Sequence, residues 1–336
     1  MNALPNLVYR LTLTAALGTV LGTVTSVHAS MIERPEVRAF AAEISIRHEI
    51  PEEEVRAILA DARHVPEVIE RATRPAERLT WQRYRPIFLT PERVEQGVEF
   101  WSRNEALLGE VADRYGVDPE IIVAILGVES RYGMHRGQHR VIDALATLAF
   151  DFPRRAGFFR SELEAYLLLA REEGFDPTEP TGSYAGAMGK PQFIASSYRA
   201  YAVDHSGNGR RDLFNDPGDA LASVANYLAV HGWRRGEPLA ARVTVTGAGW
   251  RELAAPLNRP VRVTHTAASL REAGVAVPPG IAPETRLALI ALEGEEGVEH
   301  WITHRNFYAV TRYNHSALYA MAVHQLAGEI MEARRQ

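Results

Sequence analysis

The 336-residue chain contains no cysteine. This absence excludes thiol nucleophiles, zinc–thiolate sites, iron–sulfur clusters and a lipid anchor attached through cysteine. An excess of positive charge is also missing, because 37 basic and 42 acidic residues give a formal net charge of −5. Such a surface offers little to the phosphate backbone of DNA or RNA, so we expect no nucleic-acid partner.

Long apolar runs are scarce, and the one at the N-terminus has the features of an export signal. Arg10 is the only charged residue before Glu33. Five threonines and two glycines within residues 11–25 make a poor membrane-spanning helix, although an uncleaved anchor is the alternative. We predict that residues 1–29 are a signal peptide removed after Ala29, which places the mature protein in the periplasm without a stable membrane anchor.

The rest of the sequence has the composition of a soluble globular protein, with 46% hydrophobic and 24% charged residues. Its pattern is mainly helical. Thr90 followed by proline predicts the start of a helix that continues to Tyr115 and ends at Gly116. Further helices are predicted at residues 161–172, 219–230 and 315–333.

Between residues 241 and 300 the pattern changes to short runs separated by proline and glycine. Residues 241–245 and 260–264 alternate with the period of a strand, and residues 287–292 have the composition of a buried strand. We therefore expect a small β module inserted into a mostly helical protein, which is a mainly α (α+β) fold class.

Glu129 is a candidate catalytic acid. It lies on a helix predicted from Asp118 to Arg131 with Gly133 as its end, and it shares a face with apolar residues such as Ile125. A carboxyl group in such surroundings is desolvated, which favours the protonated form that a general acid needs. The alternative is a glutamate at the helix edge that pairs with Arg131 or a later arginine.

A second candidate is the glycine-rich segment of residues 181–193, which reads TGSYAGAMGKPQF. Its glycines let backbone approach a ligand closely, while Ser183 and Gln192 offer hydrogen bonds. The spacing differs from that of a phosphate-binding P-loop, so a nucleotide site is not expected. A substrate-binding shelf and a tight structural loop both fit this pattern.

A third candidate is a calcium loop that begins at Asp204. Oxygen-bearing side chains occupy loop positions 1, 3, 5 and 9, and glycine occupies position 6, as in an EF-hand. Position 12 is Asn215 instead of glutamate, but Asp219 at the start of the next helix can complete the ligand set. A metal-free turn rich in Asp and Asn is the alternative. We predict a structural calcium ion here.

A fourth candidate is a cluster of tyrosine and asparagine near the C-terminus, around Tyr313, Asn314 and Tyr319. Aromatic rings can stack on sugars and amides can bind their hydroxyl groups, although a structural role at the edge of the core is equally consistent. The histidines have no zinc-ligand spacing, and no serine–histidine–acid set can be identified.

Six segments together resemble one family, in order over residues 33–333. They are residues 127–133 (GVESRYG), 151–155 (DFPRR), 183–193 (SYAGAMGKPQF), 204–212 (DHSGNGRRD), 223–233 and 306–316. The family is that of the membrane-bound lytic murein transglycosylase B type, glycoside hydrolase family 103.

The resemblance implies a lysozyme-like helical core with a helical N-terminal domain and a small inserted β domain. It divides the chain into a signal peptide (1–29), the N-terminal domain (30–115), the catalytic core with its EF-hand-like loop (116–235), the β domain (236–300) and the C-terminal part of the core (301–336). It also implies cleavage of the β-1,4 bond between N-acetylmuramic acid and N-acetylglucosamine in peptidoglycan.

The matching positions imply roles for individual residues. Glu129 becomes the single catalytic acid/base, and catalysis needs no cofactor. The residues that match positions lining the sugar groove are Ser183, Gln192, Tyr227, Tyr313, Asn314 and Tyr319. Arg154 and Arg155 match a pair that meets the peptide stem, which fits the carboxylate-binding geometry of arginine. The calcium ligands become Asp204, Ser206, Asn208, the Arg210 carbonyl and Asp219. Glycan strands are the expected partner, with other cell-wall enzymes as further candidates.

The implied mechanism uses one carboxyl group where most glycosidases use two. Protonated Glu129 donates to the glycosidic oxygen, and the ionised group then accepts the proton of the muramic acid 6-hydroxyl as that oxygen attacks C1. A hydrolytic muramidase and a non-catalytic peptidoglycan-binding scaffold are the alternatives. The chain departs from the family pattern at Lys190 and Pro191, where a tyrosine–glycine pair is expected. It also lacks the lipid-acceptor cysteine, which favours a soluble periplasmic variant.

Overall fold

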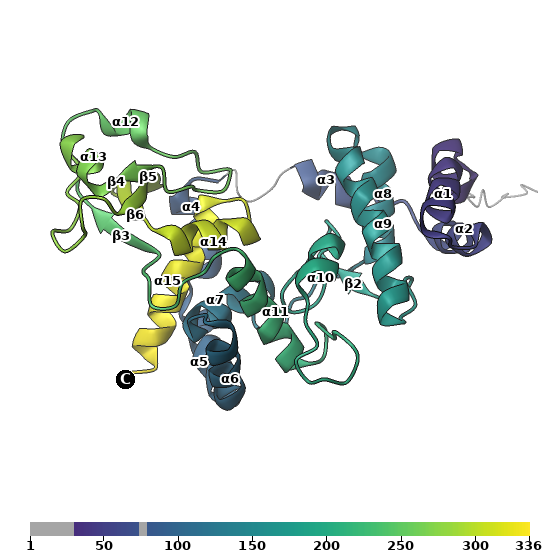
Figure 1. The fold of residues 1–336 in the computed structure, drawn as a ribbon. Coiled ribbons are helices and arrows are strands. Elements are labelled where there is room, and N and C mark those ends of the chain that lie inside the picture. The colour runs from purple at the N-terminus through teal and green to yellow at the C-terminus, as the bar shows by residue number, and fades with distance from the viewer. Residues whose placement is uncertain (1–29, 74–78) are drawn as a thin grey trace, which may run out of the picture.

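The computed structural model describes residues 30–73 and 79–336, and the signal peptide predicted at residues 1–29 lies outside the described residues. The described chain is mainly helical and contains two small antiparallel sheets. This architecture confirms the mainly α (α+β) class expected from the sequence. Figure 1 shows an elongated molecule in which the larger sheet lies at one end and the first helices of the chain lie at the other.

The first helices pack against a helix pair from the middle of the sequence. α1 (Pro35–His48), α2 (Glu52–Asp61) and α3 (Pro66–Thr73) share one hydrophobic cluster with α8 (Val141–Asp151) and α9 (Ala156–Glu173). A 3-10 turn at Met31–Glu33 precedes them. α9 contains the helix predicted at residues 161–172, which is thereby confirmed.

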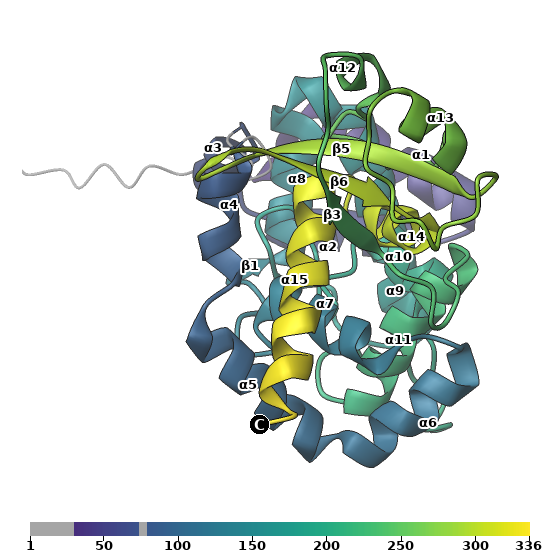
Figure 2. The same ribbon diagram turned by 90° about the vertical axis from the view of Figure 1, so that its left-hand side faces the viewer.

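A second hydrophobic cluster surrounds α7 (Pro119–Ser130), in which every residue from 121 to 128 is buried. The near-continuous apolar sequence leaves this helix no polar face, so neighbours must cover it on all sides. Figure 2 shows the long α15 running through this part of the molecule. The other helices of the cluster are α4 (Trp81–Phe88), α5 (Pro91–Arg103), α6 (Glu105–Tyr115), α11 (Pro217–Val230), α14 (Arg305–Tyr313) and α15 (Ala317–Ala333).

α11 and α15 confirm the helices predicted at residues 219–230 and 315–333. α1, α2 and α3, which precede residue 74, contribute to one hydrophobic cluster, whereas α4, α5 and α6, which follow residue 79, contribute to the other. The domain boundaries given above stay a prediction.

The single helix predicted from Thr90 to Tyr115 is wrong, because α5 and α6 are separate helices. Thr90 caps α5 as expected, and Gly116 ends α6 in the left-handed conformation, with φ 64°. The break falls at Asn104, whose side-chain amide donates to the Phe100 carbonyl at 2.7 Å. An asparagine side chain competes in this way for the carbonyl groups that a continuous helix needs.

The β module is a sheet in the order β3 (Ala240–Val243), β6 (Gly297–Thr303), β5 (Arg286–Gly294) and β4 (His265–Thr266), with every pair antiparallel. α12 (Trp250–Leu253) and α13 (Ala267–Glu272) accompany it. The strand predicted at residues 287–292 is confirmed within β5, and the one at 241–245 is confirmed in part by β3.

The strand predicted at residues 260–264 is wrong, because this segment has no strand pairing. Val261 is buried, and its N–H donates to the Thr311 hydroxyl at 3.1 Å. A contact with a helix has therefore replaced the ladder that the alternating pattern predicted. The remaining short elements are β1 (His139–Arg140), β2 (Thr181–Gly182), the 3-10 turn Pro153–Arg155 and α10 (Ala195–Tyr201).

Candidate active site

Glu129 lies half-buried in the last turn of α7. The helix predicted to run to about Arg131 ends at Ser130. Gly133 is not its stop, as was expected, because Arg131 and Tyr132 already adopt left-handed backbone conformations with φ of 51° and 59°. Residues with a β-carbon avoid this region unless their surroundings enforce it. The turn that follows Glu129 is therefore held by tertiary contacts.

Tyr132 supplies one of these contacts. Its hydroxyl donates to the Arg93 carbonyl at 2.8 Å. A β-carbon at Gly97 of α5 would lie 2.5 Å from the Tyr132 hydroxyl oxygen, and one at Gly127 of α7 would lie 2.7 Å from it. Both positions require glycine, because α5 and α7 close around the tyrosine ring.

Arg131, the residue that the sequence offered as a partner for Glu129, is bonded to α5. Its Nε donates to the Gln96 side-chain oxygen at 2.7 Å, and its guanidinium forms an ion pair with Glu92. These bonds and the buried Tyr132 attach both residues of the left-handed turn to α5.

Two tyrosines from the C-terminal helices face Glu129. Burial raises the pKa of both Tyr313 and Tyr319 well above the ordinary value, and the negative charge of Glu129 raises both further. Both phenols therefore keep their protons and remain hydrogen-bond donors at physiological pH. Ser316 caps α15 by accepting from the Tyr319 N–H at 3.4 Å, which sets the turn between the two helices.

The ring of Tyr313 also belongs to an aromatic cluster. The centroid of Tyr227 lies 4.8 Å from that of Tyr313, and the centroid of Phe193 lies 5.5 Å from it. The Tyr227 hydroxyl donates to the Arg312 carbonyl at 2.6 Å, and the Tyr313 hydroxyl donates to the Pro191 carbonyl at 2.7 Å. The orientation of each of the two tyrosine rings is thus fixed by a main-chain hydrogen bond.

A groove of about 640 Å³ opens beside this cluster, a size that suits a ligand of several rings. Tyr313 lines the groove, and the charge of Glu129 raises its pKa, but Glu129 itself is not among the lining residues. Ser183, Tyr319 and Arg154 are not among the lining residues. Five of the eight predicted substrate-binding residues do line the groove, namely Arg155, Gln192, Tyr227, Tyr313 and Asn314.

The glycine-rich segment forms a tight loop beside the groove. The Ser183 hydroxyl accepts from the N–H groups of Ala185 and Ala187, at 3.2 and 3.0 Å. Gln192 has a positive φ of 53°, and its side-chain amide donates to the Gly189 carbonyl at 2.8 Å. Ser183 therefore shapes the loop, while Gln192 is both part of the loop and exposed to the groove.

The two predicted peptide-binding arginines differ in their surroundings. Both lie exposed in the 3-10 turn that precedes α9. The Arg155 guanidinium sits 4.2 Å from the centroid of the Phe158 ring and borders the groove, whereas Arg154 does not border it. An exposed guanidinium fixed over an aromatic ring is well placed to meet a carboxylate.

The predicted calcium loop connects α10 to α11. Asp204 accepts main-chain N–H groups from Gly207 and Gly209, each at 2.7 Å, and these bonds lower its pKa. Asp219 is fully buried, and burial raises its pKa although it accepts the N–H groups of His205 and Asp212 at 2.8 and 2.7 Å. A buried carboxylate of this kind gains from a nearby cation.

The donor set is oxygen throughout, which suits calcium. In the part of the chain that the structure describes, no group of three or more histidine and acidic side chains forms a metal site by itself. A calcium ion here would therefore also need the side-chain oxygens of Ser206 and Asn208 and the Arg210 carbonyl. With those included, the residues present fit the ion.

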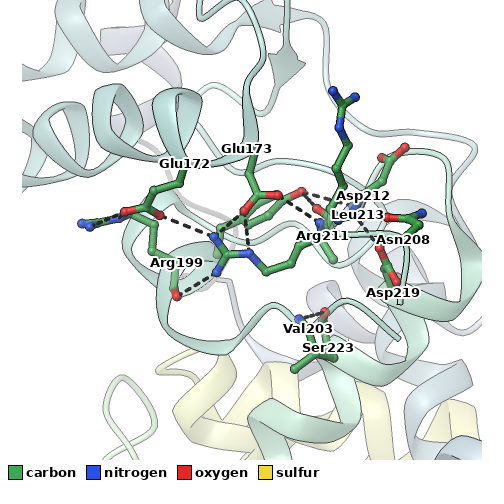
Figure 3. A network of polar contacts seen from close by, with 12 residues as sticks. Glu172, Glu173, Arg199, Val203, Asn208, Arg211, Asp212, Leu213, Asp219 and Ser223 are labelled. Atoms are coloured by element: carbon green, nitrogen blue, oxygen red, sulfur yellow. Dashed lines mark hydrogen bonds and ion pairs between the residues drawn. The ribbon is translucent and has the colours of Figure 1, made fainter. Parts of the chain in front are cut away.

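Figure 3 shows a polar network that the sequence did not reveal. Arg211 in the calcium loop forms ion pairs with Glu172 and Glu173 at the end of α9, and Glu172 also pairs with Arg199 of α10. Glu173 further accepts the Arg211 N–H at 2.9 Å. Arg211 lies nearly 40 residues from its partners, and Arg199 lies 27 residues from Glu172. Charge pairs at such separations give no periodic signal.

Comparisons with known proteins identify the family of the chain. A family model described as the transglycosylase SLT domain matches residues 33–328. The chain belongs to this family. It is a lytic murein transglycosylase, an enzyme that acts on peptidoglycan. It is 39% identical over 312 residues to membrane-bound lytic murein transglycosylase B of Escherichia coli (strain K12), covering 90% of this chain and 84% of that protein.

Solved structures of other lytic transglycosylases resemble this enzyme over about nine tenths of its length. Soluble SltB1 from Pseudomonas aeruginosa has 42% identity and a TM-score of 0.83 over 90% of this chain and 100% of that one. Escherichia coli Slt35 in complex with calcium has 40% identity and a TM-score of 0.79 over 90% and 94%. Pseudomonas aeruginosa SltB3 in complex with NAG-anhNAM-pentapeptide has 33% identity and a TM-score of 0.75 over 89% and 79%.

These relatives include one named as membrane-bound and one named as soluble. Within residues 30–73 and 79–336, none of the helices has the length and hydropathy needed to cross a bilayer.

Proposed function

We propose that Glu129 is the single acid/base of this transglycosylase and that it cleaves the β-1,4 bond between N-acetylmuramic acid and N-acetylglucosamine. The supporting observation is the position of Tyr313, which borders the groove and whose pKa is raised by the charge of Glu129. The carboxyl group is therefore next to the surface on which a glycan strand can lie. Its half-buried position at the end of an apolar helix suits a group that must be protonated at the start of the reaction.

In the proposed reaction, protonated Glu129 donates its proton to the glycosidic oxygen as the bond to C1 breaks. The substrate's own N-acetyl group stabilises the positive charge at C1. Ionised Glu129 then accepts the proton of the 6-hydroxyl while that oxygen bonds to C1. The carboxyl group ends the cycle protonated, no water is consumed, and the product carries a 1,6-anhydromuramic end. Pseudomonas SltB3, a similar protein, has been solved with an anhNAM-containing peptide, which supports this product.

The groove residues divide into two roles. Gln192, Tyr227, Tyr313 and Asn314 line it and would bind the sugar rings, with Ser183 shaping the loop that carries Gln192. Tyr319 is only 2% exposed, so its role would run through Glu129.

The two arginines would bind the carboxylates of the peptide stem. The structure favours Arg155 for direct contact, because it borders the groove. Arg154 would bind a part of the stem that extends beyond the groove.

Calcium would have a structural role. Asp204, Ser206, Asn208, the Arg210 carbonyl and Asp219 would hold the ion, and its charge would offset the repulsion among the acidic groups of the loop. The structure of the similar Slt35 in complex with calcium supports this proposal. The catalytic step needs no metal, because proton transfer at Glu129 completes it.

We further propose that the mature enzyme works in the periplasm, where its substrate is found, after removal of residues 1–29. Glycan strands of the wall would be its main partner. Other cell-wall enzymes would be the candidates for protein partners.

The deciding experiment is mass spectrometry of the muropeptides released from purified peptidoglycan by the wild type, Glu129→Gln and a control, Glu120→Gln. Glu120 is half-buried in the first turn of the same helix. Glu129→Gln should lose at least ~10²–10⁴-fold in rate, the usual contribution of a general acid/base, while Glu120→Gln keeps turnover.

Anhydro-ended products that vanish only in Glu129→Gln support the proposal. Reducing ends would make the protein a hydrolytic muramidase. No release by a folded wild type would make it a peptidoglycan-binding scaffold, and normal turnover by Glu129→Gln would remove that residue from the mechanism.

A further inference from the structure

Lys190 is the only lysine in the chain, and it lies where the calcium loop meets the turn that follows Glu129. On the side of the calcium loop, its main-chain N–H donates to the Leu213 carbonyl at 2.9 Å. Its Nζ donates to the Phe214 carbonyl, also at 2.9 Å. The side chain is half-buried and its Nζ is already hydrogen-bonded, so it does not contact substrate in the groove.

The same residue is bonded to the catalytic helix on its other side. The Ser130 hydroxyl donates to the Lys190 carbonyl at 2.6 Å, and Ser130 directly follows Glu129 in α7. The aliphatic part of the lysine lies against Gly133, where a β-carbon would come within 3.1 Å of Lys190 Cγ. Lys190 is thereby in contact with both ends of the left-handed turn.

Within the calcium loop, further hydrogen bonds link Phe214 to the buried Asp219. The Asp212 side chain accepts the Phe214 N–H at 2.9 Å, and the Asp212 N–H donates to Asp219 at 2.7 Å. Leu213 and Asp219 appear together in the network of Figure 3. A continuous set of hydrogen bonds therefore runs from the buried acid of the loop, through Lys190, to the last turn of α7.

We propose that Lys190 is a positioning residue that fixes the carboxyl group of Glu129 by fastening the turn after α7 to the calcium loop. The proposal rests on the proposed role of Glu129. A general acid must hold its proton within hydrogen-bond distance of the glycosidic oxygen, and a displacement of about 1 Å can reduce the rate by roughly 100-fold. The loss of Lys190 should therefore lower kcat and leave substrate binding nearly unchanged.

The test compares Lys190→Met with Arg271→Met on a soluble peptidoglycan fragment. Arg271 is a matched control in the β module, where its guanidinium donates to the Pro278 and Ile281 carbonyls at 2.9 and 2.7 Å. Lys190→Met should lower kcat by about 10-fold or more with KM changed by less than about 2-fold. Lys190→Arg should recover much of the loss, because a cationic donor is restored. Arg271→Met should keep both constants.

A double-mutant cycle gives a readout that a merely structural role would not produce. If Ser130 and Lys190 act through one connection, Ser130→Ala combined with Lys190→Met should lose little more kcat than the worse single variant. Losses that multiply would overturn the proposal, as would a fall in stability with an unchanged kcat.

Because the chain has one lysine, protein labelled with [13Cε]lysine gives one side-chain NMR signal that reports Lys190 directly. Asp212→Ala should shift this signal, and Arg271→Met should not. An unmoved signal in Asp212→Ala contradicts the connection to the loop. If Glu129→Gln were fully active, the proposed function itself would fail. If Glu129→Gln is inactive while Lys190→Met matches the wild type, only the present inference fails.

Discussion

The ring of Tyr313 stacks on the ring of Tyr319, with centroids 6.3 Å apart and planes within 9° of parallel. The charge of Glu129 acts on both phenols. Glu129 and the two tyrosines, which follow it by nearly 200 residues of sequence, therefore form one electrostatic unit. The Tyr313 hydroxyl donates to the Pro191 carbonyl, so the Tyr319 hydroxyl is the donor that faces the charge of the carboxyl group during the reaction.

Tyr319→Phe should lower kcat by roughly 10-fold, because it removes one donor dipole from the carboxylate while keeping the ring. Steady-state kinetics on a peptidoglycan fragment measures this effect. Tyr166→Phe is the control, since that buried phenol donates to the Pro177 carbonyl at 2.7 Å within the α8–α9 part of the molecule. An unchanged kcat in Tyr319→Phe would separate this tyrosine from catalysis.

Gly127→Ala should destabilise the enzyme by about 1–3 kcal/mol, the usual penalty for overpacking a core. The new methyl group would lie 2.7 Å from the Tyr132 hydroxyl oxygen. Gly109→Ala in α6 is the opposite case, because nothing lies within 4 Å of its β-carbon position. It should stabilise by about 0.5–1 kcal/mol, since alanine favours a helix over glycine. Urea unfolding of both variants measures the pair, and equal signs would contradict the packing described for Tyr132.

The sequence predicted α7 and the place of Glu129 on it, because a buried helix bounded by proline and polar residues has a strong local pattern. It did not predict α14, since the tyrosine and asparagine cluster in this region was interpreted as a sugar-binding or structural cluster and not as a helix. The interruption at Asn104 was also missed. One asparagine side chain interrupts the helix there, while the helical spacing of apolar residues continues across the interruption.

The family resemblance assigned Tyr313 and Tyr319 to the sugar groove, and no pattern in the residues predicted their approach to Glu129. Neither the residue pattern nor the family resemblance predicted the ion pair between Arg211 and Glu173. Such contacts depend on how distant helices pack, and a single sequence carries no periodic trace of that packing.

Acidification should destabilise the enzyme partly through His324 on α15. Burial lowers the pKa of this residue below its ordinary value of about 6.5, so the unfolded chain takes up a proton more readily than the folded one. Its contribution to stability is therefore lost as the pH falls through 6.5. His324→Gln should show a smaller drop in Tm between pH 7.5 and pH 5 than the wild type. His135→Gln, at an exposed position, should match the wild type. Identical drops in all three proteins would contradict the assignment.

Calcium should raise Tm in the wild type and lose this effect in Asp204→Ala. At 100 times Kd, a single site adds about 2.7 kcal/mol to the free energy of unfolding. Asp216→Ala is the control, because Asp216 caps α11 through the Gly218 and Asp219 N–H groups. It should lower Tm by removing the cap yet retain the calcium response. Flat melting curves with chelator and with added calcium would count against the site.

Four non-glycine residues in the described chain have a positive φ, and three of them surround the candidate acid. Arg131 and Tyr132 follow its helix, and Gln192 follows Pro191, to which Tyr313 is bonded. Each such residue stores roughly 1–3 kcal/mol of conformational strain. Selection for thermal stability alone would favour glycine at these positions. The more stable variants would be poorer catalysts, because the strained backbone that lowers stability also maintains the geometry of the site.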